Sequence, residues 1–240
     1  AWVNWFTANA PGVDYFLYLI DESTNYAQTQ NWASWIETNP GVGKNLKSLA
    51  TIDLPKAQAN VPSLDIAVSW IPVADTTSWQ NAYNNVASQY PNRQFYCYNG
   101  KRPASGSFAT DDDGVALREL AWGQNKKGIH RWFFWESTYY NDYQSGRGQN
   151  NLFNTAVTFG GASTNDSVLG ETGWNHTNGD GVLFYPGTDT VYTADSYGVQ
   201  GPIASLRLKH WRRGIQDVDY IELAKAKNPT AVQTLINTMV

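Results

Sequence analysis

The fold is decided by a short stretch near the start of the chain, Tyr15-Phe-Leu-Tyr-Leu-Ile-Asp-Glu22. Its first six residues are apolar or aromatic, and two carboxylates and the polar segment 23–25 follow them. A short apolar run that ends at a polar break is typical of a β-strand in a parallel β/α unit. The stretch therefore predicts a parallel strand that ends in an acidic pair.

The same pattern recurs along the chain. Five further β-type runs are expected to form strands: Leu46–Asp53, Leu64–Trp70, Gln94–Tyr98, Ile129–Trp135 and Gly181–Tyr185. The amphipathic stretches between them are expected to form helices: Ala27–Glu37, Thr77–Tyr90, Asp112–Asn125 and Ile203–Lys225. Strands that alternate with helices indicate parallel β/α units. We therefore predict an α/β fold of the (β/α)8 TIM-barrel type.

The number of predicted strands bears on the domain organisation. A chain of 240 residues is long enough for one large domain. Only six strands are expected, however, and a closed barrel needs eight. The opening segment, Ala1–Ala10, looks like a helix that leads into the first strand. We expect residues 1–240 to form a single catalytic domain that is the C-terminal part of a barrel, its N-terminal part missing or supplied by another chain.

Composition excludes several classes of partner. The formal net charge of -4 gives no general affinity for a phosphate backbone, so nucleic acid is not expected. The apolar runs are much shorter than the about 20 residues of a membrane-spanning helix, so no membrane association is expected. Two glycosylation motifs, which begin at Asn165 and Asn175, favour a secreted or extracellular protein.

Cysteine and histidine usage gives no reason to expect a metal or a cofactor. Cys97 is the sole cysteine, which excludes an internal disulfide framework and a zinc site built from cysteines. It lies within an apolar run, so we interpret it as a buried strand thiol. The three histidines are widely separated and lack the spacing of metal ligands.

Aromatic residues are unusually frequent, with 11 Trp and 14 Tyr. Many of them fall where the predicted strands end, which in β/α barrels is the edge that carries the active site. Flat aromatic rings cover the apolar faces of sugars. Trp70, Tyr98 and Trp135 are therefore predicted walls of a carbohydrate site, although simple packing in the core is an equal alternative. The expected partner is an oligosaccharide or polysaccharide.

Polar residues at the same strand ends are candidates for binding sugar hydroxyls. They are Asp53, Asn99 and Glu136. Asp53 precedes Leu-Pro55 and could equally serve as a turn former. Glu136 could bind a hydroxyl or act as a second catalytic carboxylate.

The pair Asp21-Glu22 is the predicted catalytic centre. Cleavage of a glycosidic bond commonly uses two carboxylates, and in substrate-assisted enzymes one of them only orients the 2-acetamido group of the sugar. Side chains alternate between the two faces of a strand, so both carboxylates can serve one site only if the strand has ended or bent by Asp21. The alternative is a solvated loop or a helix start.

Three blocks near the other end of the chain carry a family resemblance. They are Gly179-Asp-Gly-Val-Leu-Phe-Tyr-Pro-Gly187, Gly201-Pro-Ile-Ala-Ser-Leu-Arg-Leu208 and Arg212-Arg-Gly-Ile-Gln-Asp-Val-Asp-Tyr220. In order and spacing they resemble the closing strand and helix of the catalytic domain of glycoside hydrolase family 123. Tyr18-Leu-Ile-Asp-Glu22 is similar to that family's strand-end Asp-Glu, and Trp132-Phe-Phe-Trp-Glu136 is similar to its aromatic strand. The resemblance covers essentially the whole chain and the later part of the family's domain.

The resemblance implies a retaining, substrate-assisted hydrolase that removes a terminal β-linked N-acetylhexosamine, with N-acetylgalactosamine favoured. Glu22 would be the acid/base and Asp21 the residue that stabilises the acetamide. Two alternatives stay open. One is a glycosidase for a sugar without an acetamide, using Glu22 and a second carboxylate. The other is a non-catalytic carbohydrate-binding protein on a degenerate barrel.

Overall fold

The computed structural model describes residues 1–69, 77–89, 93–100, 105–143, 146, 148–159, 165–166, 171–172 and 178–238. The chain divides into two compact units. The first unit contains Ala1–Trp70, Ala74–Tyr98 and Ile129–Trp132, and the second contains Ile71–Val73, Asn99–Gly128 and Phe133–Val240. Two residues with predicted roles lie outside the described part of the chain: Trp70, a predicted wall of the carbohydrate site, and Asn175, the first residue of a glycosylation motif.

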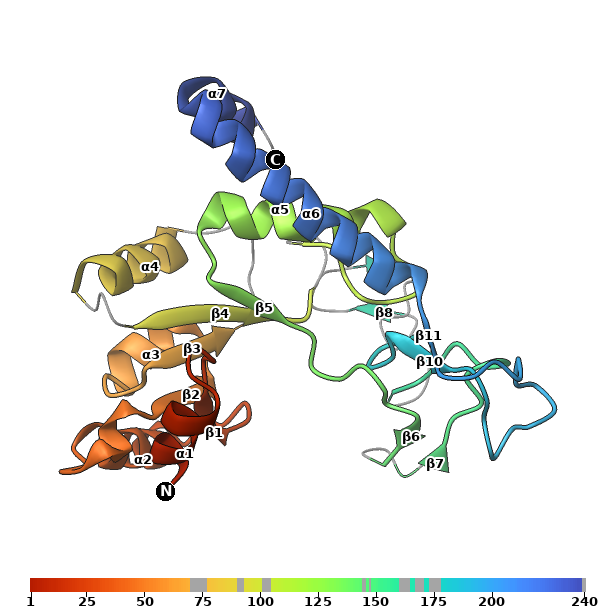
Figure 1. Cartoon of the computed structure of the whole chain (residues 1–240), viewed down its shortest axis with the longest axis horizontal. Helices are drawn as coiled ribbons and strands as arrows, with labels where there is room; N and C mark the ends of the chain where they lie inside the picture. Colours follow the sequence, from red (N-terminus) through yellow and green to blue (C-terminus); the bar gives the residue numbers. More distant parts are fainter. Residues whose placement is uncertain are drawn as a thin grey trace. The chain divides into compact units, whose positions relative to one another are not determined.

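The first unit is built on a sheet in which the strands follow their order in the sequence (Figure 1). The strands are β1 (Phe16–Ile20), β2 (Lys47–Thr51), β3 (Ile66–Ser69), β4 (Gln94–Tyr98) and β5 (Arg131–Phe133). β1 pairs with β2, β2 with β3 and β3 with β4, each time in parallel. All five strands were expected from the apolar runs, and the mixed α/β fold class is confirmed.

Helices connect the first four strands of this sheet. The connecting elements are α2 (Tyr26–Glu37), the 3-10 helix η1 (Val42–Asn45), α3 (Leu54–Asn60) and α4 (Thr77–Gln89), and α1 (Trp2–Asn9) precedes β1. The sequence did not predict η1 or α3, because elements of four and seven residues are too short to show a helical period. Pro55 lies in the first turn of α3, where the fixed φ angle of proline suits the start of a helix.

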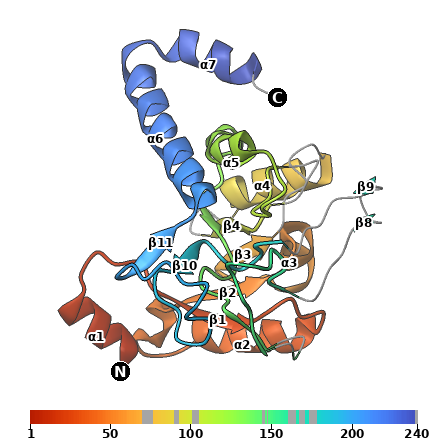
Figure 2. The same ribbon diagram turned by 90° about the vertical axis from the view of Figure 1, so that its right-hand side faces the viewer.

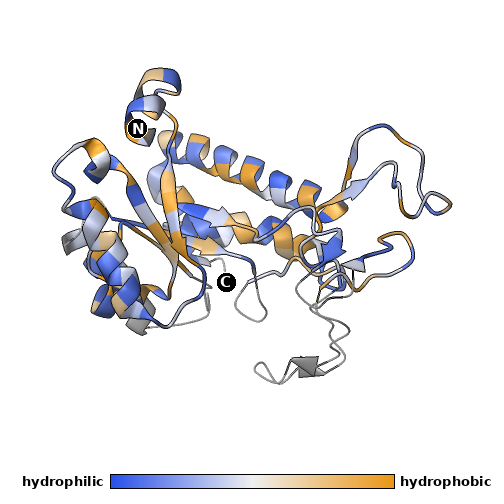
Figure 3. Ribbon diagram, turned by 90° about the horizontal axis from the view of Figure 1, so that it is seen from below, coloured by the Kyte–Doolittle hydropathy of each residue, from blue (hydrophilic) through white to orange (hydrophobic). Residues whose placement is uncertain are grey.

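The core of the first unit lies in the central strands of the sheet. All four residues of β3 are buried, as are the middle three residues of β2 and of β4. Figure 3 shows this as hydrophobic colour along the strands and mixed colour along the helices. Cys97 on β4 is fully buried, which confirms its interpretation as a strand thiol, and burial raises the pKa of that thiol.

The second unit combines helices with short two-stranded sheets. Its helices are α5 (Gly114–Lys127), α6 (Leu206–Lys227) and α7 (Pro229–Thr238), and Figure 2 shows α7 turning away from the axis of α6. Its strand pairs are β6 (Asn141–Asp142) with β7 (Gly148–Gln149), β8 (Asn165–Asp166) with β9 (Glu171–Thr172), and β10 (Phe184–Pro186) with β11 (Pro202–Ala204). Each pair is antiparallel.

A close helix crossing holds α5 against α6. A Cβ atom at Gly214 would lie 2.2 Å from the carbonyl oxygen of Arg118, so only glycine permits this approach. At the same crossing Arg118 Nε lies 2.5 Å from a carboxylate oxygen of Asp217, which also accepts a hydrogen bond from the Trp122 indole. The Arg118 guanidinium bonded to Asp217 holds the pKa of that carboxyl below its usual range.

Two sequence expectations in the second unit are wrong. Gly181–Tyr185 was expected to continue the parallel strands, but Gly181 has φ +74° and the strand begins only at Phe184, where it pairs antiparallel with β11. The final helix was expected from Ile203, but it begins at Leu206. The Ser205 side chain accepts a hydrogen bond from Leu208 N at 3.2 Å, and this cap fixes the helix start after an extended segment.

A five-stranded sheet with helices between its first four strands is compatible with part of a TIM-type barrel. Within the described residues, no helix has both the length and the apolar character needed to cross a membrane.

Candidate functional site

The carboxyl ends of the parallel strands of the first unit bring polar side chains to one edge of the sheet. Asp21 and Glu22 follow β1, Thr51 ends β2, Ser69 ends β3 and Tyr98 ends β4. Ligands of parallel α/β folds bind at this edge, because the connecting loops there are free to carry functional groups. The edge is therefore the candidate site.

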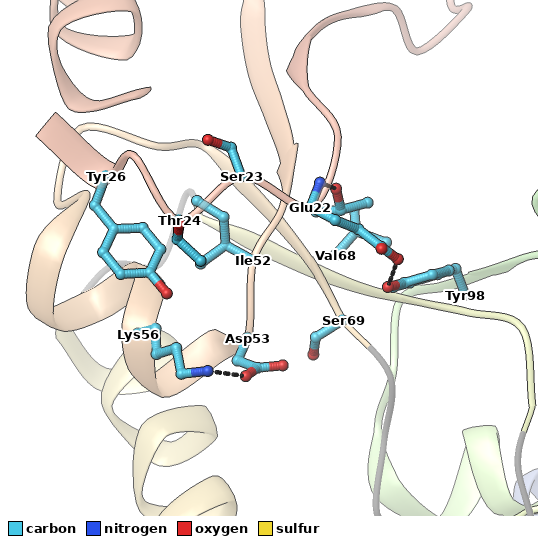
Figure 4. A pocket seen from close by; sticks show the side chains of 11 residues that line it. Glu22, Ser23, Thr24, Tyr26, Ile52, Asp53, Lys56, Val68, Ser69 and Tyr98 are labelled. Carbon is cyan, nitrogen blue, oxygen red and sulfur yellow. Dashed lines mark hydrogen bonds and ion pairs between the residues drawn. The ribbon is translucent and has the colours of Figure 1, made fainter. Parts of the chain in front are cut away.

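A cavity of about 300 Å³ opens at this edge (Figure 4). It is lined by Glu22, Ser23, Thr24, Tyr26, Thr51, Ile52, Asp53, Lys56, Val68, Ser69 and Tyr98, all of which belong to the first unit. The volume is at the lower end of the about 300–1,000 Å³ that is usual for small-ligand pockets. It is suited to a single sugar ring better than to a long segment of polysaccharide.

The backbone turns sharply at the acidic pair. β1 ends at Ile20, and Glu22 has φ +46°, in the left-handed region that non-glycine residues rarely adopt. The strand has thus ended before Asp21, as the two-carboxylate interpretation requires. Such a conformation is stored strain, and strain of this kind collects at functional sites.

Glu22 faces the cavity and is bonded from β4. The Tyr98 hydroxyl donates a hydrogen bond to Glu22 Oε1, as Figure 4 shows. Burial, and then the bond to Glu22, raise the pKa of Tyr98 above its ordinary value. Tyr98 therefore stays a neutral donor at physiological pH. It was predicted as an aromatic wall, and its ring does line the cavity, but its hydroxyl is the group that contacts the acidic pair.

Asp21 is held by two hydroxyl groups from β1 and β2. Tyr18 Oη donates to Asp21 Oδ1 at 2.5 Å, and Thr51 Oγ1 donates to the same oxygen at 2.9 Å. Thr51 Oγ1 also accepts a hydrogen bond from the Glu22 backbone N–H at 2.5 Å. Burial and the bond to Asp21 raise the pKa of Tyr18, which keeps this hydroxyl protonated as well.

Asp53 lines the same cavity and forms an ion pair there. Its carboxylate lies 2.8 Å from Lys56 Nζ, one turn along α3, and this contact raises the pKa of Lys56. Asp53 precedes the first residue of α3, but its side chain caps no backbone N–H. Among the described residues of the lining, Lys56 is the only cation, and it is neutralised by Asp53. The cavity therefore offers no unopposed positive charge for an anionic sugar.

The other predicted site residues that the structure describes, Asn99, Trp135 and Glu136, belong to the second unit. Asn99, with φ +54°, accepts a hydrogen bond on its side-chain oxygen from Trp135 N at 3.1 Å. The Trp135 indole donates to Asp180 at 2.8 Å and packs against Tyr139. Asn99 and Trp135 are thus brought together, and their roles in substrate binding stay predictions.

Glu136 has local backbone partners. Its Oε1 accepts hydrogen bonds from Ser137 N at 3.0 Å, Thr138 N at 3.2 Å and Thr138 Oγ1 at 3.3 Å. A carboxylate that bonds the two following amides closes the turn after the strand. This geometry gives Glu136 a structural task, and its predicted contact with substrate stays a prediction.

Sequence reasoning missed several hydroxyl residues of the site, among them three on the strands of the sheet: Tyr18, Thr51 and Ser69. Each lies inside or at the end of a predicted strand. Ser69 is 2% exposed, and its hydroxyl has no hydrogen-bond partner among the described residues. A polar residue in the last position of an otherwise buried parallel strand is the signal that could have found Thr51 and Ser69.

Metal ligands are not grouped in the described part of the chain, where no three His, Cys, Asp or Glu side chains are placed to hold an ion together.

Comparison with known proteins supports the fold assignment. No family model matches the sequence, and no curated protein matches it. Among solved structures, the chain is similar to a family 123 glycoside hydrolase from Clostridium perfringens, studied for glycolipid glycan hydrolysis, with a TM-score of 0.57 and 13% identity. The chain shares its fold with part of a glycoside hydrolase. The match covers 92% of this chain and 33% of the clostridial chain, so this chain spans about a third of that protein's length.

Proposed function

We propose that this protein is a retaining, substrate-assisted glycoside hydrolase that removes a terminal β-linked N-acetylhexosamine, preferably N-acetylgalactosamine, from glycans. The observation that carries the proposal is the placement of Asp21 and Glu22. They follow the parallel strand β1, Glu22 lines a cavity of single-sugar size, and Asp21 lies beside it in a network of hydroxyl donors.

The proposed reaction has two steps. In the first, Glu22 donates a proton to the glycosidic oxygen while the bond from that oxygen to C1 breaks, and the acetamide oxygen of the same sugar bonds to C1. Asp21 accepts a hydrogen bond from the acetamide N–H and stabilises the positive charge that develops on the resulting oxazolinium ring. In the second, Glu22 takes a proton from water as the water oxygen bonds to C1 and the acetamide is restored. Two inversions at C1 retain the β configuration.

The cavity supports a neutral sugar as the substrate. Glu22 and Asp53 contribute carboxylates, and the positive charge of Lys56 is engaged by Asp53. A sulfated sugar or a uronic acid would meet net repulsion here, whereas N-acetylhexosamine carries no charge. Ile52 and Val68 add an apolar surface that could receive the acetamide methyl group.

The sheet is proposed to be part of a (β/α)8 barrel that further polypeptide completes. The support is the fold shared with a much longer glycoside hydrolase and the exposure of β1, where Phe16 is 36% and Tyr18 47% exposed. Secretion is proposed on the two glycosylation motifs. Measuring the intact mass of protein from the culture medium before and after enzymatic removal of N-glycans tests it.

Activity is tested with the full-length protein and a nitrophenyl β-N-acetylgalactosaminide. Glu22→Gln should lower kcat by about 100- to 10,000-fold, the usual contribution of a general acid–base. Glu119→Gln, a change at an exposed carboxylate on α5, is the matched control and should leave kcat unchanged. Undiminished turnover by Glu22→Gln would overturn the proposal.

The acetamide requirement is tested separately. The matching galactoside, with a hydroxyl at C2, should not be cleaved, and proton NMR of the first-formed product should show the β anomer. Rapid cleavage of the galactoside would instead favour a glycosidase that uses Glu22 with a second carboxylate. Saturable sugar binding without turnover would favour a carbohydrate-binding protein.

A further inference from the structure

We propose that Thr51 is a positioning residue that, together with Tyr18, fixes which oxygen of Asp21 faces the substrate. The inference rests on the proposed function and assigns work to a residue of the neighbouring strand. Its basis is that a single hydroxyl group contacts both members of the acidic pair.

Thr51 lies next to Asp21 because of the way that β1 and β2 pair. β1 and β2 are paired in parallel, with Ile20 beside Ala50, so the residue after Ala50 comes next to the residue after Ile20. Thr51 is the last residue of β2 and Asp21 the first after β1. The strand pairing, with its register shift between Tyr18 and Ile20, therefore brings the hydroxyl of Thr51 next to the carboxylate.

The single proton of the Thr51 hydroxyl is donated to Asp21. A hydroxyl has one proton to donate and two lone pairs to accept with. Thr51 Oγ1 lies 2.9 Å from Asp21 Oδ1, which has only lone pairs, so its proton goes there. One of its lone pairs accepts the Glu22 N–H at 2.5 Å. Thr51 thus bonds the side chain of Asp21 and the backbone of Glu22 at the same time.

The two carboxylate oxygens of Asp21 differ in their hydrogen bonds. Tyr18 and Thr51 both donate to Oδ1, at 2.5 and 2.9 Å. Within the described ranges no hydrogen bond reaches Oδ2. Two donors on one oxygen resist rotation of the carboxylate, and they leave the other oxygen open to an N–H of the substrate. The acetamide-binding atom is therefore Asp21 Oδ2.

The backbone of Glu22 is strained at φ +46°. The hydrogen bond from its N–H to Thr51 holds the peptide in that conformation. The same hydroxyl therefore keeps Glu22 aimed at the cavity and Asp21 beside it. Loss of this hydroxyl should disturb both carboxylates together.

The test compares Thr51→Val, which removes the hydroxyl and keeps the branched shape, with Thr51→Ser, which keeps the hydroxyl. With the nitrophenyl acetamido-sugar as the substrate, Thr51→Val should lower kcat about 10- to 100-fold with little change in KM, and Thr51→Ser should stay within about threefold of the parent protein. Thr38→Val, which removes an exposed hydroxyl that donates to the carbonyl of Ser34 at 2.7 Å, is the control for a generic Thr-to-Val effect.

A second readout separates positioning from mere stability. In substrates with one, two or three fluorine atoms on the acetamide methyl group, kcat should fall steeply with fluorination when the acetamide attacks C1. The steepness should change in Thr51→Val and be restored in Thr51→Ser. Equal steepness and equal kcat in Thr51→Val would overturn the proposal while leaving the proposed function standing.

A crystal structure of Thr51→Val gives an answer that is independent of turnover. Its Asp21 carboxylate should rotate relative to the parent protein, and an unmoved Asp21 would overturn the proposal. If the parent protein cleaves no acetamido-sugar, the proposed function fails, and the orientation of Asp21 in the two crystal structures still decides whether Thr51 positions it.

Discussion

The segments that follow β1 and β5 both place a carboxylate directly after an apolar or aromatic run. The two segments differ in the groups that form hydrogen bonds with those carboxylates. Asp21-Glu22 follows an apolar run in the first unit, and Glu136 follows the aromatic run 132–135 in the second. At the first, hydroxyl groups from β1, β2 and β4 bond the carboxylates, and no hydrogen bond from a described residue reaches Asp21 Oδ2. At the second, backbone amides of the next two residues bond the carboxylate and close a turn. A carboxylate bonded by side-chain hydroxyls of the sheet keeps an oxygen for a ligand, whereas one bonded by the amides of its own turn supports the backbone.

The largest expected effect that separates these two sites is the loss of charge at Asp21. Asp21→Asn keeps the size of the side chain and the acceptor for Tyr18 and Thr51, but it removes the negative charge that would stabilise the oxazolinium ring. The kcat on the nitrophenyl acetamido-sugar should fall about 100-fold or more, as for loss of an electrostatic contact in a transition state. The melting temperature should be unchanged. A kcat equal to that of the parent protein would remove Asp21 from the mechanism.

Glu136 should behave in the opposite way. Glu136→Ala leaves the amides of Ser137 and Thr138 without their carboxylate acceptor, so the free energy of unfolding should fall by about 1–2 kcal/mol, as when a capping side chain is lost. The kcat should stay within about twofold. Chemical denaturation and initial-rate kinetics measure the two quantities. A large loss of kcat with unchanged stability would make Glu136 a participant in the reaction and break the contrast.

Asp217 offers a pH test of a structural carboxylate. Its pKa is lowered in the folded protein by the bond to Arg118, so it contributes stability that is present above the ordinary pKa of an aspartate, near 3.8. That contribution should be lost as the pH falls through the folded value, by about 1 kcal/mol, since the side chain of its partner Arg118 is 42% exposed. Urea unfolding of the parent protein and of Asp217→Asn between pH 3 and 7 measures it. Identical pH dependence in both would contradict the assignment.

Ser69 gives the smallest expected change. Its hydroxyl is buried and finds no partner in the part of the chain that the structure describes, so it costs free energy rather than contributing it. Ser69→Ala should leave the free energy of unfolding equal or raise it by up to about 1 kcal/mol. Thermal denaturation checks this, and Ser63→Ala, which removes a hydroxyl that accepts a bond from Gln30 at 2.9 Å, should be destabilising instead. A clear loss of stability in Ser69→Ala would show that the hydroxyl is satisfied.

The first unit could be predicted from the sequence, because its strands are continuous apolar runs bounded by polar breaks. All of β1 to β5 lie within expected strands, and the ends of those strands identified Asp21, Glu22 and Tyr98. The condition on the pair, an end to the strand by Asp21, was also correct. What the pattern could not supply was Thr51 and Tyr18, whose role depends on the register of β1 against β2.

The second unit could be predicted only in its helices α5 and α6. Its strands have two or three residues, which is too short for any period, and they pair antiparallel across loops. The expected strand 181–185 failed because Gly181 adopts the left-handed conformation, and the expected helix start at Ile203 failed because the Ser205 cap starts the helix at Leu206. Neither feature has a periodic signature. Arg207 is a further example: it is buried and donates to three backbone carbonyls, a structural use that helical spacing alone did not suggest.

The left-handed backbone at Glu22 has a consequence for how this protein could change over time. Glycine adopts such angles freely, so Glu22→Gly would relieve strain of about 1 kcal/mol while removing the acid. A lineage that had abandoned catalysis would gain robustness from that single change, in the usual trade between stability and activity. A glutamate at a position where glycine would be less strained therefore fits the proposed chemistry better than it fits sugar binding alone.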